Sequence, residues 1–76
     1  MKSLAELLHG IRPEADFAAS DDFMADGMLD SFDMITLVST LDKNFGISIN
    51  GADIVPAHFR NFEAIAALLR RYGVVA

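Results

Sequence analysis

The sequence has 76 residues, no cysteine, 53% hydrophobic residues and 22% charged residues. A chain of this length can bury one small core, and its hydrophobic fraction is typical of a globular domain and argues against intrinsic disorder. Eleven acidic and six basic residues give a formal net charge of −5, which repels nucleic acid and anionic lipid and favours partners with basic patches. We therefore expect a single domain over residues 1–76 without a nucleic-acid partner.

The residue types that are missing narrow the possible chemistry further. Without cysteine there are no disulfides, thiolate metal sites or cysteine nucleophiles, and the composition fits a reducing compartment. The N-terminus from Met1 to Glu6 has no apolar stretch long enough for a signal peptide, and no uncharged run approaches the roughly 18 residues of a membrane span. The expected protein is soluble and cytoplasmic, with no insertion into a membrane.

The first helix is predicted to begin after Ser3, which has the spacing of a capping box with Glu6. Apolar residues at helical spacing define its buried face: Leu4, Leu7, Leu8 and Ile11. Gly10 weakens the last turn and Pro13 prevents much continuation, so this helix should end between about residues 9 and 12. A long irregular connection over residues 13–29 follows, anchored by its apolar residues Phe17, Phe23, Met28 and Leu29.

The central helix is predicted from Asp30 to Phe45. Its apolar face consists of Met34, Leu37, Val38, Leu41 and Phe45, and Phe32 and Ile35 are expected to widen this stripe on its other side. Asp30 is suited to the N-cap, and the carboxylate of Asp33 complements the helix dipole in the first turn. Gly46 is placed to end the helix in the left-handed conformation.

The C-terminal part predicts a connector and two more helices, without a sheet. Ile47 to Ile49 alternates like a strand but is too short and has no partner run, so we expect an extended connector that ends at Asn50 and Gly51. A short helix within residues 53–59, around Pro56, should bury Ile54, Val55 and Phe59. Asn61 should cap a last helix with the inner face Phe62, Ile65, Leu69 and Tyr72. The fold class is therefore all-α, a bundle of three main helices and one short one, with a long loop between helices one and two.

Ser31 is the best candidate in the sequence for a residue that is covalently modified. It follows the predicted N-cap, so its hydroxyl points outward and is not needed for capping. A phosphodiester formed there would lie beside free backbone N–H groups at the positive end of a helix dipole. Asp30 and Asp33 would repel that phosphate, and we interpret them as docking charges, as dipole complements, or as both. Serine is common in first turns, so an ordinary helix-start residue is the alternative.

The segment Asp26-Gly27-Met28-Leu29-Asp30-Ser31-Phe32 resembles the acyl carrier protein family. The likeness continues through Ile35, Leu37-Val38, Leu41 and Phe45-Gly46-Ile47, and with the later helices it covers nearly the whole chain. The resemblance implies a helical bundle in which Ser31 carries a covalent 4'-phosphopantetheine derived from coenzyme A. It also implies a non-enzymatic carrier that holds an acyl or aminoacyl cargo as a thioester.

The resemblance implies partners as well. These are a phosphopantetheinyl transferase, a ligase that loads the cargo, and a downstream transferase or synthase, which a monomeric shuttle would visit in turn. Asp30, Phe32, Asp33 and Met34 are the candidate docking residues, although Met34 also fits a core position. Asp-Ser-Phe is similar to carriers of amino acids such as D-alanine. Thr36, Lys43 and Asn44 dilute the acidic character usual in carriers of fatty acids.

The sequence also allows two other functions. A carrier-like interaction module would use the acidic second helix without ever receiving the arm. Residues 22–33 also approximate a calcium-binding EF-hand loop through Asp22, Asp26, Gly27 and Asp33, but Met24 replaces a ligand and the position of the bidentate glutamate holds Asp33. His9 and His58 have no second ligand at helical metal spacing. We therefore expect no metal site.

Overall fold

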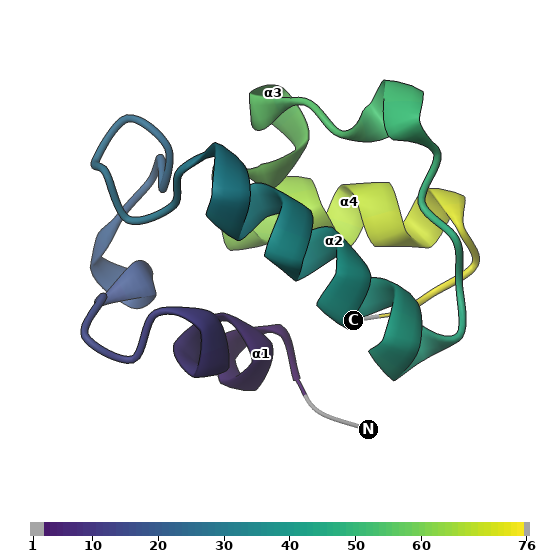
Figure 1. The fold of residues 1–76 in the computed structure, drawn as a ribbon, viewed down its shortest axis with the longest axis horizontal. Coiled ribbons are helices and arrows are strands. Elements are labelled where there is room, and N and C mark those ends of the chain that lie inside the picture. Colours follow the sequence, from purple (N-terminus) through teal and green to yellow (C-terminus); the bar gives the residue numbers. More distant parts are fainter. Residues whose placement is uncertain (1–2, 76) are drawn as a thin grey trace.

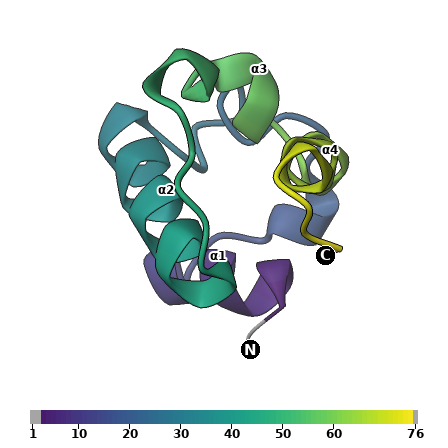
Figure 2. The same ribbon diagram turned by 90° about the vertical axis from the view of Figure 1, so that its right-hand side faces the viewer.

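The computed structural model describes residues 3–75, and within this range every regular element is helical (Figure 1). The elements are α1 (Leu4–Ile11), the 3-10 helix η1 (Phe17–Ala19), α2 (Ser31–Phe45), the 3-10 helix η2 (Gly51–Asp53), α3 (Pro56–Phe59) and α4 (Phe62–Arg71). Seen along the bundle, the four α-helices surround one central core (Figure 2). The all-α bundle with a long first connection is confirmed.

Helix α1 begins and ends as its sequence predicts. The Glu6 backbone N–H donates to Ser3 Oγ at 3.3 Å, and the Ser3 N–H donates to Glu6 Oε1 at the same distance, which completes the capping box. The helix ends at Ile11 with Arg12 as its C-cap, inside the predicted boundary, and it contains Gly10. The apolar face packs against α2 across Leu7 and Leu8, which are both buried.

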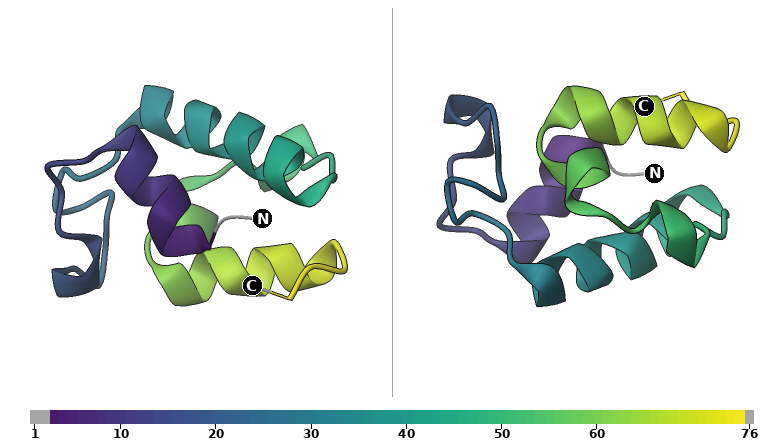
Figure 3. Two further views of the ribbon diagram at one scale, coloured as in Figure 1. Left: turned by 90° about the horizontal axis from the view of Figure 1, so that it is seen from below. Right: turned by 90° about the horizontal axis from the view of Figure 1, so that it is seen from above.

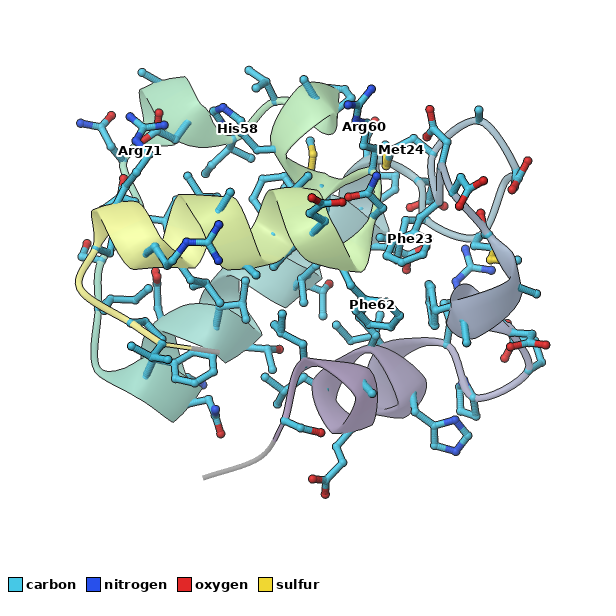
Figure 4. The ribbon with its side chains drawn as sticks, turned by 180° about the vertical axis from the view of Figure 1, so that it is seen from behind. Phe23, Met24, His58, Arg60, Phe62 and Arg71 are labelled. Carbon is cyan, nitrogen blue, oxygen red and sulfur yellow. The ribbon has the colours of Figure 1, made fainter. Side chains whose placement is uncertain are left out.

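The connection between α1 and α2 is held by Phe23, which is fully buried. Its ring meets Phe17 edge-to-face with centroids 4.9 Å apart, and meets Phe62 of α4 at 5.2 Å (Figure 4). The Phe23 carbonyl accepts from the N–H groups of Met28 and Leu29 at 2.8 and 3.1 Å. The loop closes one end of the bundle (Figure 3), and Phe23 thereby sets where the chain enters α2.

Helix α2 follows its predicted caps but not its predicted buried width. Asp30 is the N-cap, and Gly46 ends the helix with φ at 65°, the left-handed conformation that glycine adopts without strain. Phe32 and Ile35 do not widen the buried stripe, since they are 82% and 60% exposed. Phe32 lies five residues before the fully buried Leu37, and five residues turn a helix by about 140°, which places Phe32 toward solvent.

The C-terminal half contains α3 and α4 in the predicted places. Phe59 is fully buried, but Val55 is 37% exposed because it lies outside α3 as its N-cap, so its predicted burial is wrong. Asn61 caps α4 through a 2.7 Å bond from the Ala64 N–H to its side-chain oxygen. The inner face of α4 consists of Ile65, Leu68 and Leu69, with Phe62 and Tyr72 half-buried at its ends.

The Tyr72 side chain links the end of α4 to η2 through hydrogen bonds. Neither this link nor η2 was predicted from the sequence. The Tyr72 hydroxyl donates to Asp53 Oδ2 at 2.6 Å and accepts from the Asn50 N–H at 2.9 Å. The hydrogen bond from Tyr72, followed by the charge of Arg71, lowers the pKa of Asp53, and the same bond raises the pKa of Tyr72.

None of the helices described within residues 3–75 has the length and apolar character needed to cross a bilayer.

Candidate functional site

Ser31 is the first residue of α2 and is exposed to solvent. The helix is capped by its neighbours Asp30 and Asp33, without the Ser31 hydroxyl. The Asp33 N–H donates to Asp30 Oδ1 at 2.9 Å, and the Asp30 N–H donates to Asp33 Oδ2 at 3.1 Å, so the two carboxylates form a reciprocal capping box. The Ser31 hydroxyl makes no hydrogen bond with the described residues. It is therefore free to react.

The backbone beside Ser31 suits a phosphate. The N–H groups of Ser31 and Phe32 belong to the first turn of α2 and have no acceptor within residues 3–75. Such groups point out of the helix start and, with the helix dipole, favour a bound anion. A phosphodiester on the Ser31 oxygen would lie within this field, so the residues present fit the group that the resemblance implies.

Arg12 is the residue of this site that sequence reasoning missed. Its Nε donates to Asp33 Oδ2 at 2.9 Å, one terminal nitrogen lies 2.6 Å from the same oxygen, and that nitrogen lies 3.4 Å from Asp30 Oδ2. The hydrogen bond from Arg12 lowers the pKa of Asp33, and the bond and charge of Asp33 raise the pKa of Arg12. A signal was available, because no lysine or arginine occurs between residues 13 and 42.

Arg12 thus joins the C-cap of α1 to the capping box of α2.

The sequence matches the family model described as phosphopantetheine attachment site over residues 2–69. The protein belongs to this family. A search of curated proteins and a search of solved structures gave no significant match. Members of the family hold 4'-phosphopantetheine covalently and act as carriers rather than as catalysts.

The surface around Ser31 of this carrier domain includes two exposed apolar side chains. Phe32 follows Ser31 directly, and Ile35 lies four residues on, about 40° around the helix and so on the same flank. Met34 is only 8% exposed and packs in the core, as one of its two interpretations predicted, with Phe32 and Ile35 outermost. The predicted docking set therefore divides into an exposed aromatic ring, two carboxylates held by Arg12, and a buried methionine.

A groove of about 500 Å³ lies between α1 and α2, on the other flank of the carrier domain. It is lined by Glu6, Leu7, Gly10, Ile11, Asp33, Thr36 and Thr40. Thr40 lies nine residues after Ser31, which is about 180° around the helix. The groove therefore lies mainly on the opposite side of α2 from Ser31 and meets the site only at Asp33.

The carboxylates of the EF-hand spacing are engaged in the fold of the carrier loop. Asp22 Oδ1 accepts from the N–H groups of Met24 and Ala25 at 3.1 and 3.0 Å, and Asp26 accepts a hydrogen bond from Ser20 Oγ. His58 Nδ1 contacts the Asp53 carbonyl at 2.8 Å. Among residues 3–75, no three histidine, aspartate or glutamate side chains are grouped to hold a metal ion.

Proposed function

We propose that the protein is an acyl or aminoacyl carrier that receives 4'-phosphopantetheine on Ser31 and delivers its cargo to partner enzymes. The observation that carries this proposal is the exposed Ser31 hydroxyl, which is left without a hydrogen-bond partner in the described chain because Asp30 and Asp33 cap α2. Membership of a family that holds this group covalently supports the same conclusion.

In this proposal the chain supplies the nucleophile and the attachment point for the arm, and the partner enzymes supply the catalytic sites. The Ser31 oxygen would form one bond to the phosphorus of coenzyme A that carries the pantetheine arm. The pyrophosphate bond of coenzyme A breaks, adenosine 3',5'-bisphosphate leaves with the bonding electron pair, and the hydroxyl proton passes to a base of the transferase. The attached arm supplies a terminal thiol that holds the cargo as a thioester. Tethering raises the effective concentration of the cargo at each enzyme that the carrier visits.

The partners proposed for this cycle are a phosphopantetheinyl transferase, a loading ligase and a downstream transferase or synthase. We propose that they dock around Ser31, with Phe32 outermost, Asp30 and Asp33 at its edge and Met34 beneath. A shuttle needs weak docking, because it must leave one enzyme before it reaches the next. The exposed ring of Phe32 is the largest apolar contact available beside the attachment point.

The cargo proposed is a specialised acyl or aminoacyl group. Asp30-Ser31-Phe32 resembles the motif of carriers for amino acids such as D-alanine. The solvent-facing side of α2 carries Thr36 and Lys43 in addition to Phe32, in place of the acidic residues frequent in carriers of fatty acids. This surface supports enzymes other than those of general fatty acid synthesis as partners.

The test is the intact mass of the protein after incubation with coenzyme A and a promiscuous phosphopantetheinyl transferase. We expect a gain of one phosphopantetheine, and no gain in Ser31→Ala. Ser39→Ala is the matched control, because Ser39 is also an exposed serine of α2 and should leave the gain intact. No gain in the wild-type protein with several transferases would contradict the proposal and favour a carrier-like interaction module that lacks the arm.

A further inference from the structure

The three carboxylates of the α2 region are all occupied within the fold. Arg12 contacts Asp33 at 2.6 Å and Asp30 at 3.4 Å, and Asp42 Oδ1 accepts from the Ile49 N–H at 3.0 Å. The Asp33 side chain is only 16% exposed, so little of its carboxylate remains for a partner to contact. Arg12 also lies 3.5 Å from Glu14 Oε1, so its single positive charge is shared among three carboxylates, of which Asp30 and Asp33 belong to the start of α2.

The apolar side chains beside Ser31, unlike these carboxylates, have no partner among the described residues and are exposed to solvent. Phe32 is 82% exposed and Ile35 is 60% exposed, and both flank Ser31. Exposed aromatic rings that enter a pocket are the contacts that dominate the energy of protein interfaces, whereas solvated charges at a rim mainly steer the approach. Apolar area is thus available to a partner beside Ser31, whereas Arg12 offsets part of the carboxylate charge there and the Asp30 side chain stays 58% exposed.

We propose that Arg12 masks the carboxylates beside Ser31, so that the enzymes acting on this carrier recognise it through an apolar pocket for Phe32 rather than through a basic patch. This inference rests on the proposed attachment at Ser31. Arg12 acts as a specificity-determining residue from α1, without itself contacting the attached group. A partner with a strongly basic docking surface would have to compete with Arg12 for Asp33.

The experiment measures the rate of phosphopantetheine attachment by a transferase with a basic docking surface, with coenzyme A saturating, between about 20 and about 300 mM salt. KM for the wild-type carrier should change less than about two-fold over this range, because Arg12 pairs with the carboxylates beside Ser31. Arg12→Gln should lower KM at low salt by about three- to five-fold, and the advantage should vanish at high salt, because the one positive charge that offsets Asp30 and Asp33 is removed.

Two variants separate the mask from a structural role of Arg12. Arg12→Gln combined with Asp33→Asn removes both charges, so it should return to the shallow salt dependence although the Arg12 contact is still lost. Arg70→Gln is the charge-matched control: Arg70 is exposed near the C-terminal end of α4, at the opposite end of the molecule from the start of α2 (Figure 3). It should leave the salt dependence of KM unchanged.

Phe32→Ala tests the apolar half of the inference and should raise KM by a similar factor at every salt concentration. Equal salt dependence in wild type, Arg12→Gln and Arg70→Gln would overturn the inference while leaving the proposed function in place. A salt dependence of Arg12→Gln that the added Asp33→Asn does not reverse would also overturn it. No attachment to the wild-type carrier at any salt concentration would overturn the proposed function, and the inference with it.

Discussion

Replacing Phe23 by alanine should destabilise the domain far more than the same replacement at Phe32. Phe23 is fully buried and its ring forms edge-to-face pairs with Phe17 and Phe62, whereas Phe32 is 82% exposed. Truncation of a buried phenylalanine to alanine costs about 3–5 kcal/mol, and each lost aromatic pair contributes about 0.5–1.5 kcal/mol beyond burial. We therefore expect a cost near the upper end of that range for Phe23→Ala, and less than about 0.5 kcal/mol for Phe32→Ala.

The assay is equilibrium unfolding in urea, followed by far-ultraviolet circular dichroism. At about 0.05–0.15 kcal/mol per residue, a 76-residue domain has a free energy of unfolding of about 4–11 kcal/mol, so Phe23→Ala leaves it marginal or unfolded. Phe17→Ala provides a milder variant, since Phe17 has one ring partner where Phe23 has two, and its cost should be intermediate. Equal unfolding midpoints for Phe23→Ala and Phe32→Ala would refute the assignment of Phe23 as the anchor of the loop.

Two glycines and one carboxylate give further predictions. Gly10→Ala should raise the free energy of unfolding by about 0.5–1 kcal/mol, because Gly10 lies inside α1 with nothing within 4 Å of an added Cβ. Gly46→Ala should lower it by about 1 kcal/mol, since its φ of 65° is strained for alanine; urea unfolding that shifts the same way for both would contradict this. The pKa of Asp33 is lowered in the fold, so its stabilising contribution is complete above about pH 4 and is lost as the pH falls through the lower, folded value. Asp33→Asn should therefore flatten the decline in the free energy of unfolding below about pH 4, and an unchanged slope would disprove the coupling.

The helix boundaries could be predicted because their signals are local. Ser3, Asp30 and Asn61 each accept a hydrogen bond from the backbone N–H three residues further on, and such a pairing can be recognised in a short stretch of sequence. The position of Ser31 after its cap follows from the same local pattern. The free hydroxyl at the candidate site was therefore accessible to sequence reasoning.

The exposure of one side of α2 and the contacts of Arg12 could not be predicted, because they depend on residues that are distant in the sequence. Phe32 and Ile35 have the residue types of a core, and only the packing of the other helices shows that this side of α2 has no neighbour to cover it. Arg12 meets Asp33 across 21 residues, and the loop that brings them together is held by ring contacts of Phe23. Contacts that depend on such a closure are set by the whole fold rather than by spacing in the chain.

Capping and modification place opposing demands on a serine at a helix start. A serine at the N-cap would commit its oxygen to the N–H groups of the first turn, and an attached phosphodiester would then compete with the cap. Here the cap and the free hydroxyl belong to adjacent residues, with Asp30 as the cap and Ser31 as the proposed site of modification. That division puts two carboxylates next to the proposed attachment point, where they oppose a phosphate. Arg12 offsets this repulsion and at the same time fixes the capping box to α1. The same ion pair therefore bears on the proposed attachment at Ser31, on the stability of the α2 start and on the charge that partners encounter.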